Sequence, residues 1–282
     1  MSSLTPTGKR SPAGPPQRKG RPMPHRTAYP AVHRGHRPAG ALTRAAAALA
    51  LVLAATLAPA AGRASEESGA FDVSFGGIRA GVIAFRAQET AAGAYTAHGS
   101  ARASGLLGAL FDAEIDTVAQ GTVSGNTYRP KVAREVTIDG KDDTERTYRY
   151  SGAGVPTITR TPPRGPSSHA APPEAQAGTV DTTTAAWAIL RDRPAALACQ
   201  LDISIYDGRR RHRIELNRAE PAQGGLTCSG RYTRVAGFSP DDMAERREWP
   251  LTMRYAAIPG GTLRVEQLSF PTSFGRARIT RR

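Results

Sequence analysis

The chain contains few of the residue patterns on which common catalytic and metal sites depend. It has two cysteines in 282 residues, and the three histidines after residue 64, which are His98, His169 and His212, show no metal-ligand spacing. We find no Gly-x-Ser-x-Gly nucleophile elbow, no P-loop and no glycine fingerprint of a dinucleotide-binding fold. The sequence therefore predicts no metal site, no cofactor and no recognisable enzyme, and its carboxylates do not show the arrangement of a hydrolytic acid/base pair.

Acidic residues are missing from the first 64 positions, which hold ten of the 38 lysines and arginines. The other 218 residues carry 28 basic and 24 acidic side chains, so the formal charge of +14 falls to +4 without this segment. Residues 1–44 are rich in Pro, Gly, Arg and His and have no apolar periodicity, which predicts a disordered basic leader. Met23 is an alternative start, and a basic arm that binds nucleic acid or anionic lipid is the other interpretation of the charge.

Long hydrophobic runs are also absent. Ala45–Leu57 is uncharged and apolar but has only 13 residues, whereas a membrane span needs about 20. Small residues follow, so residues 45–64 match the hydrophobic and cleavage regions of a secretory signal, with cleavage near Ala60 to Ala64. We expect a periplasmic or secreted protein. The alternative is an uncleaved N-terminal anchor, and membrane contact is otherwise expected only transiently.

The remaining residues, 65–282, favour a single β-rich domain. Short alternating segments broken by Gly, Asp and Asn predict about ten antiparallel strands, and a sheet of that size tends to curl or close. Residues 162–178 are rich in proline and predict a mobile loop or an extended connector. One helix is predicted over Asp181–Arg193, with Asp181 or a following threonine as its cap, Trp187 on its edge and Pro194 at its end.

The two cysteines, Cys199 and Cys228, both follow the signal segment. An even count in an oxidising compartment suggests one disulfide between them, which would close a loop of roughly 30 residues. Two separate buried thiols are the alternative.

The segment Ile205–Leu216, IYDGRRRHRIEL, predicts a β-hairpin with Asp207 and Gly208 at the centre of a two-residue turn. This register places Asp202 directly opposite Arg213 as an ion pair. It assigns a solvated face to Tyr206, Arg209, Arg211 and Arg213. A solvated arginine face, together with the modest charge after residue 64, argues against a nucleic-acid partner.

The same register directs Arg210 and His212 toward the apolar face of the hairpin. Either they lie at the rim of the sheet and extend to water, or they line the mouth of a cavity and contact an anionic group. A register shift of one residue would exchange the two faces.

Several segments together resemble the proteobacterial domain-of-unknown-function 3108 family. The resemblance covers about residues 70–280 and rests on Phe71–Gly81, Val180–Leu190, Cys199, Tyr206–Leu216, Cys228 and Tyr232–Phe238. It implies an exported protein of unassigned activity with an incomplete antiparallel barrel around a helix, similar to periplasmic lipoprotein carriers. Members usually have Asp-Pro before the helix, where this chain has Asp181 and Thr182. The family supplies no catalytic residues to carry over.

The expected fold is thus mainly β, a strongly curved antiparallel sheet or incomplete β-barrel wrapped on one main α-helix. Three functions are consistent with it. The first is non-catalytic binding of a lipid or hydrophobic peptide, with Arg210, His212 and Trp187 as candidate ligand contacts. The second is a structural or interaction protein of the periplasm with no small-molecule ligand. The third is a hydrolase of an envelope polymer.

Overall fold

We describe the protein from a computed structural model. The described residues are 65–105, 114–139, 143–165, 167–272 and 275–282. The predicted leader and signal segment lie outside the described residues.

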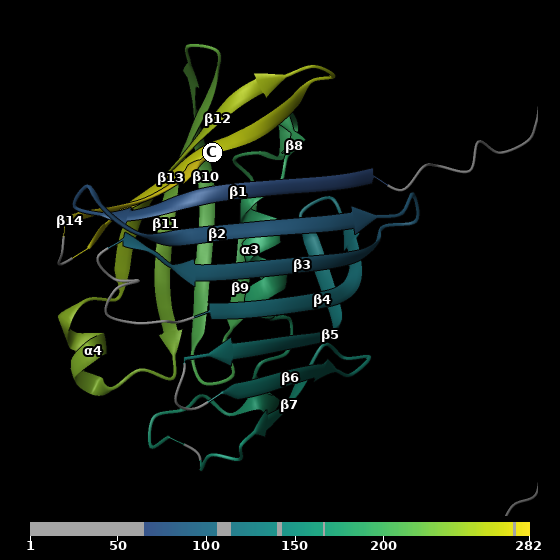
Figure 1. The fold of residues 1–282 in the computed structure, drawn as a ribbon, viewed down its shortest axis with the longest axis vertical. Coiled ribbons are helices and arrows are strands. Elements are labelled where there is room, and N and C mark those ends of the chain that lie inside the picture. The colour runs from purple at the N-terminus through teal and green to yellow at the C-terminus, as the bar shows by residue number, and fades with distance from the viewer. Residues whose placement is uncertain (1–64, 106–113, 140–142, 166, 273–274) are drawn as a thin grey trace, which may run out of the picture. The chain divides into compact units, whose positions relative to one another are not determined.

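Within the described residues, fourteen strands form one antiparallel sheet, compared with the ten or so that the sequence predicts (Figure 1). The hydrogen-bonded order is β7-β6-β5-β4-β3-β2-β1-β14-β13-β12-β11-β10-β9, and the short β8 pairs with β13. The first seven strands are β1 (Ser65–Phe75), β2 (Ile78–Glu89), β3 (Ala94–Ala103), β4 (Glu114–Ser124), β5 (Thr127–Ile138), β6 (Thr144–Tyr150) and β7 (Pro156–Thr161). The others are β8 (Arg193–Pro194), β9 (Leu201–Tyr206), β10 (Arg211–Ala222), β11 (Gly225–Ala236), β12 (Glu248–Ile258), β13 (Thr262–Thr272) and β14 (Gly275–Arg281).

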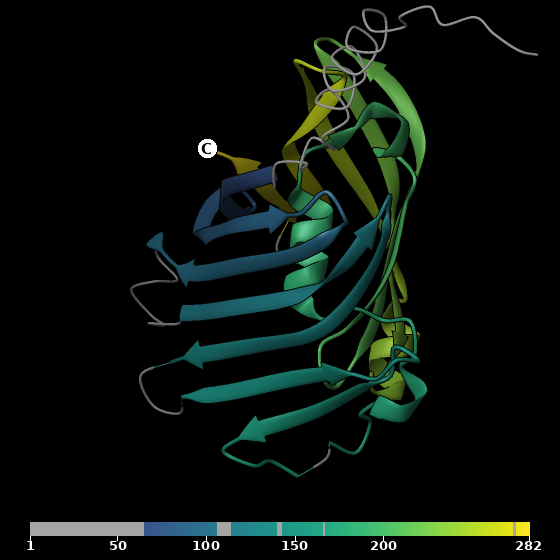
Figure 2. The ribbon, with the colours of Figure 1, turned by 90° about the vertical axis from the view of Figure 1, so that its right-hand side faces the viewer.

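The sheet curves around the helix α3 (Thr182–Leu190) without closing into a barrel, as the sequence predicts. Figure 2 shows α3 on the concave side, between the first seven strands and the strands of the C-terminal half. Strand twist accumulates over so many strands, which is why the sheet bends. A second helix, α4 (Pro240–Glu245), connects β11 to β12.

A row of small side chains lets α3 approach the first half of the sheet. Ala97, Ala119 and Ala133 are register neighbours on β3, β4 and β5, and each is at most 2% exposed. Trp187 packs on this side, with its ring 4.8 Å from the Tyr95 ring and 5.6 Å from the Tyr128 ring. Aromatic rings at these separations attract one another in addition to burying area. The helix is therefore fixed to β3, β4 and β5.

Asp181 caps the helix, as predicted. Its Oδ1 accepts from the Thr184 backbone N–H at 2.9 Å, and its Oδ2 accepts from the Thr184 hydroxyl at 2.7 Å. Asp181 is fully buried, and burial raises the pKa of its carboxyl. The predicted helix end is wrong, because α3 stops at Leu190, before Pro194. Arg193 folds back to donate to the Ala188 carbonyl, which would otherwise lack a partner at the helix end.

The segment at residues 162–178 packs against the β9–β10 turn. The Ala171 N–H donates to the Arg209 carbonyl at 2.8 Å, and the Tyr206 hydroxyl donates to the Ala171 carbonyl at 2.7 Å. Within this segment, Pro173–Ala175 form a short 3-10 helix. The contacts of Ala171 correct the prediction for Tyr206, which is only 1% exposed because this segment covers the face assigned to solvent.

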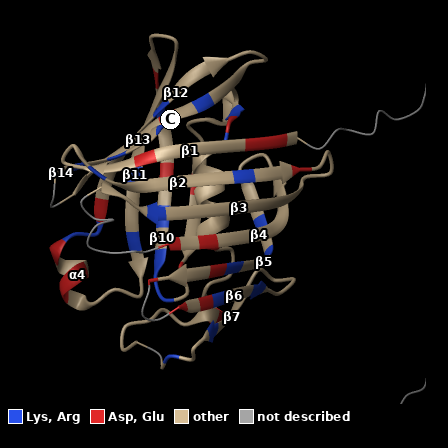
Figure 3. Ribbon diagram, viewed as in Figure 1, with Lys and Arg blue, Asp and Glu red and all other residues tan. Residues whose placement is uncertain are grey.

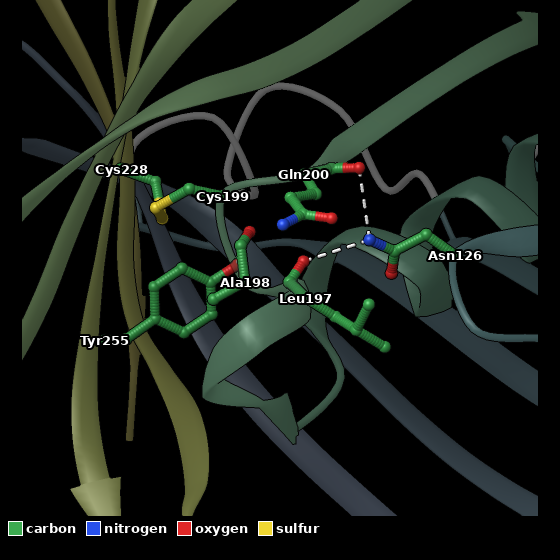
Figure 4. The surroundings of a disulfide bond; sticks show 7 residues. All are labelled: Asn126, Leu197, Ala198, Cys199, Gln200, Cys228 and Tyr255. Carbon is green, nitrogen blue, oxygen red and sulfur yellow. Dashed lines mark hydrogen bonds between the residues drawn. A yellow bond between two sulfur atoms is a disulfide. The ribbon is translucent and has the colours of Figure 1, made fainter.

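The cysteines form the predicted disulfide, Cys199–Cys228, with Cα atoms 5.3 Å apart (Figure 4). It joins the connection after the helix to β11. Asn126, in the β4–β5 turn, holds the same connection from the other side by donating to the Leu197 and Gln200 carbonyls at 2.9 and 3.1 Å. The helix exit is thereby tied to both halves of the sheet.

We predict that Cys199→Ala/Cys228→Ala lowers the free energy of unfolding by about 3–4 kcal/mol, because the bond closes a loop with a sequence separation of 29. Urea unfolding of both proteins, with and without reductant, measures this. Reductant should lower the stability of the wild type and leave the variant unchanged. An equal midpoint for the oxidised and reduced wild type would contradict the prediction.

Charged side chains surround the helix exit. Asp192 pairs with Arg264 at 2.6 Å and with Arg281 at 3.5 Å, and Glu67 accepts from the Asp192 backbone N–H. Burial, reinforced by the Asp192 charge, raises the pKa of Glu67 from 4.5 to about 7, although Arg191 and Arg281 oppose the rise. The folded protein therefore holds the Glu67 proton more tightly than the unfolded chain does.

Because the folded protein holds this proton more tightly, we predict that the contribution of Glu67 to the free energy of unfolding falls as pH rises from about 4.5 to about 7. Glu67→Gln resembles the protonated acid, so its stability relative to wild type should increase over this range by on the order of 2 kcal/mol. Denaturant unfolding at several pH values measures the difference. Glu66→Gln, whose carboxylate is exposed, is the matched control and should follow the wild-type pH profile; a Glu67→Gln profile parallel to wild type would contradict the assignment.

Candidate ligand-binding cavity

A cavity of about 1250 Å³ lies between α3 and the strands of the C-terminal half, and β2 also contributes to its wall. It exists because the two sides of α3 differ. Trp187 packs toward β3 and β5, whereas the first two turns of the other side present only Thr182, Ala185 and Ala186 to the cavity. The bulky partner that would fill this second side is absent from the described part of the chain.

The cavity walls are mostly apolar. The helix contributes Thr182, Ala185, Ala186, Ile189 and Leu190. The sheet contributes, among others, Ile83, Ile205, Ile214, Leu251, Leu268 and Ile279. These residues alternate with outward-facing ones along their strands, so the inward face of each strand forms one stripe of the wall.

Polar groups gather where the β9–β10 turn meets β11. This turn has four residues, 207–210, rather than the two predicted, and Arg211 is opposite Tyr206. The register is thus shifted by two residues, which leaves the faces unchanged, so His212 lies on the apolar side as predicted. Asp202 and Arg213 still form an ion pair at 2.7 Å, but on a diagonal, because Glu215 is the residue opposite Asp202.

Arg210 lines the cavity from the turn itself and not from a strand. Its guanidinium lies over the Phe238 ring, with Cζ 5.0 Å from the centroid. Its buried Nε has no hydrogen-bond partner, and no carboxylate among the described residues forms an ion pair with it. Asp207 shapes this turn, because its Oδ1 accepts from the backbone N–H groups of Arg209 and Arg210. Arg210 is therefore a cation at an apolar cavity that makes no direct ion pair among the described residues, although the charge of Asp242 on α4 acts on it from beyond ion-pair distance.

His212 lines the cavity between two polar partners. Its Nδ1 lies 2.5 Å from the Tyr232 hydroxyl, and its Nε2 lies 3.2 Å from Asp207 Oδ2. Burial would raise the pKa of Asp207, but hydrogen bonds from His212 and the turn lower it below its ordinary value. Both ring nitrogens are thus occupied, so His212 orients its neighbours and does not offer a free donor to a ligand.

Arginines and aromatic rings stack beside this pair. Arg234 lies over Phe238 at 5.3 Å and over Trp249 at 4.6 Å, measured from Cζ to the ring centroids. Its Nη1 donates to the Asp242 and Arg246 carbonyls, so its charge is held near the cavity by the α4 segment. Such stacks place cations on ring faces, and here Nη1 of Arg234 is also 3.9 Å from a Glu245 carboxylate oxygen.

Trp187 does not line the cavity. It is 1% exposed and faces the opposite wall of the sheet, so its position does not match the ligand contact predicted for it.

Four further residues, which the sequence analysis did not single out, line the same cavity. They are Tyr232, Arg234, Phe238 and Trp249. The period-two spacing of Tyr232 and Arg234 next to the hairpin of His212 was the available signal.

The outer face of the hairpin carries paired charges. Arg213 contacts both Asp202 and Glu215, and Arg231 on β11 also contacts Glu215. Figure 3 shows basic and acidic residues interspersed along the strands, with no single basic face in the view. Arg213 and Arg231 on this surface are thus ion-paired, whereas Arg210 at the cavity forms no ion pair among the described residues.

The family model named "Protein of unknown function (DUF3108)" matches residues 70–256, about two thirds of the chain. The chain belongs to the DUF3108 family. The matched range includes the helix, the cysteine pair and the polar end of the cavity, while β13 and β14 lie beyond it. The DUF3108 resemblance inferred from the sequence is confirmed over this range.

One similar solved structure is the crystal structure of a beta-barrel-like protein of domain of unknown function DUF1849 from Brucella abortus. It is 10% identical, covers 76% of this DUF3108 chain and 94% of its own, and has a TM-score of 0.39. No curated protein matches the chain.

Within the described ranges of the DUF3108 chain, no helix is both long and apolar enough to span a membrane. Nor do these ranges bring three or more His, Cys, Asp or Glu side chains together in an arrangement that would hold a metal ion.

Proposed function

We propose that this protein is an exported, non-catalytic carrier or binder of an amphiphile that has an acyl-type chain and an anionic head group. The chain would occupy the apolar cavity beside α3, and the head would meet Arg210. The unpaired Arg210 guanidinium at the end of an apolar cavity is the observation that carries the proposal.

The size and lining of the cavity support a chain-like ligand. Its volume of about 1250 Å³ exceeds the range of about 300–1,000 Å³ that holds most drug-sized ligands. Each methylene moved from water to such walls contributes about 0.8 kcal/mol. A fully packed interior would have favoured the structural alternative instead.

The charges at the cavity support an anionic head group. The ionisable groups among its described lining residues are Arg79, Arg210, His212, Tyr232 and Arg234, and none is a carboxylate. Arg79 is already paired with Asp72 at 3.0 Å. A lining without Asp or Glu gives no support to the hydrolase hypothesis, which needs a convergent acid/base pair.

Native mass spectrometry of residues 65–282, purified gently from the periplasm of the source organism, tests the proposal directly. A reproducible extra mass that is lost on denaturation, and that contains an alkyl chain and an acidic group, is the expected result. A bare protein that takes up neither fatty acid nor phospholipid on challenge would overturn the proposal and favour a structural or interaction role.

Filling the cavity should block binding. Ala186 is on the cavity side of α3, so we predict that Ala186→Phe reduces uptake of a fluorescent fatty acid at least tenfold while the fold is retained. Ala257→Phe adds the same ring at an exposed position on β12 and should bind like wild type. Circular dichroism checks the fold of both variants. Undiminished uptake by a folded Ala186→Phe protein would place the ligand elsewhere.

Removing the free cation should weaken binding of the head group. A charge-assisted hydrogen bond contributes about 1.5–3 kcal/mol, so Arg210→Gln should weaken fatty-acid binding about 10- to 100-fold. Arg209→Gln removes the same charge from the adjacent, exposed position and is the control. Titration calorimetry measures both constants. Equal losses in the two variants would indicate a general charge effect and not a head-group contact.

A further inference from the structure

At the polar end of the cavity, three side chains are linked by hydrogen bonds in a row. Asp207, His212 and Tyr232 are linked through both imidazole nitrogens, with the Tyr232 hydroxyl at the end that borders the cavity. A hydroxyl has a single hydrogen to donate, so the protonation of His212 decides where that hydrogen points.

Two arrangements satisfy these contacts. When His212 is neutral, its Nε2–H donates to Asp207 and its Nδ1 accepts the Tyr232 hydrogen, so Tyr232 has none left for a ligand. When His212 is protonated, Nδ1–H donates to the Tyr232 oxygen instead. The Tyr232 hydrogen is then released and can be donated to another acceptor in the cavity.

We propose that Tyr232 is a head-group donor gated by His212, so that binding of the anionic head is accompanied by uptake of protons from solvent. This inference rests on the proposed function, since it names the regulation of the same site. The proton is added at His212 Nδ1, and the Tyr232 hydrogen moves from its bond with Nδ1 to a bond with an oxygen of the ligand head.

The surrounding charges explain why binding and protonation are coupled. Arg234 is directly opposite His212 in the β10–β11 register, Arg210 lies at the end of the turn, and Asp207 contacts the other side of the imidazole. Asp242 and Glu245 of α4 neighbour Arg234, and Arg79 is paired with Asp72. An incoming anion offsets the two arginines and thereby favours the imidazolium.

Tyr232 suits this role in position and packing. Its ring lies 5.6 Å from the His212 ring and 5.5 Å from the Trp249 ring, so its hydroxyl is held in place. Burial raises the pKa of Tyr232, although Arg234 and Arg210 act against the rise, which keeps the hydroxyl protonated as a donor. His98 and His169 are exposed and do not line the cavity.

The test uses titration calorimetry of residues 65–282 with myristyl sulfate, whose charge does not change with pH, and with myristyl alcohol as the uncharged control. Between about pH 8 and about pH 5, the range in which imidazoles change charge, the sulfate should bind on the order of tenfold more tightly. The alcohol should show no such change. Repeating the titration near pH 7 in buffers of different ionisation enthalpy should reveal uptake of about half a proton per sulfate bound, which is the most that a tenfold change in affinity allows.

Two variants separate this relay from a general charge effect. Tyr232→Phe keeps the ring contacts and should lose about tenfold in sulfate affinity at low pH only. His212→Gln should bind the sulfate equally at both pH values. Thermal unfolding at each pH checks that both variants are folded.

Sulfate binding with equal affinity across this pH range, or a Tyr232→Phe loss that is the same at both ends, would overturn the relay while leaving the proposed function in place. Failure of both probes to bind at any pH would overturn the proposed function and the relay together. If only His212→Gln is unfolded, the wild-type and Tyr232→Phe titrations still decide the question.

Discussion

The rest of the structure depends on how α3 is held against one wall of the sheet. Trp187 packs against the Tyr95 and Tyr128 rings of β3 and β5, and Asp181 and Arg193 satisfy the helix ends. A helix fixed on this side cannot also fill the space toward the C-terminal strands. The cavity is therefore a consequence of one-sided packing, and the disulfide and Asn126 maintain that geometry by holding the connection that leaves the helix.

The polar end of the cavity shows how one turn organises several functions. Asp207 accepts backbone hydrogens within the turn, which directs Arg210 toward the cavity, and its second oxygen orients His212. Arg210 makes no ion pair with a carboxylate among the described residues, whereas Arg213 and Arg231 on the outer face are paired. Its place at the end of an apolar cavity, with a buried Nε that lacks a hydrogen-bond partner, supports the proposed anionic ligand, because a buried polar group without a partner is costly.

Some of the site could be predicted from residue order, and some could not. The alternation along Leu201–Leu216 predicted that His212 lies on the inner face, and the structure places it there. The observed turn is two residues longer than the predicted one, and a shift of two residues, the period of a strand, leaves each side chain on the same face. Trp187 was misplaced as a ligand contact because a helix buried on nearly all sides shows no periodicity that tells a packed wall from a cavity. Tyr206 was misplaced because a distant proline-rich segment covers it.

The sequence by itself determined the mainly β fold, the curved sheet around one helix, the cysteine pair and the DUF3108 family, since alternation, capping and spacing are properties of local sequence. Only the tertiary structure decided that a cavity exists and that Arg210 forms no ion pair among the described residues. It also decided that Tyr232, Arg234, Phe238 and Trp249 line the same cavity as Arg210. These features depend on contacts between strands far apart in the chain, whose registers and side-chain volumes no local pattern encodes.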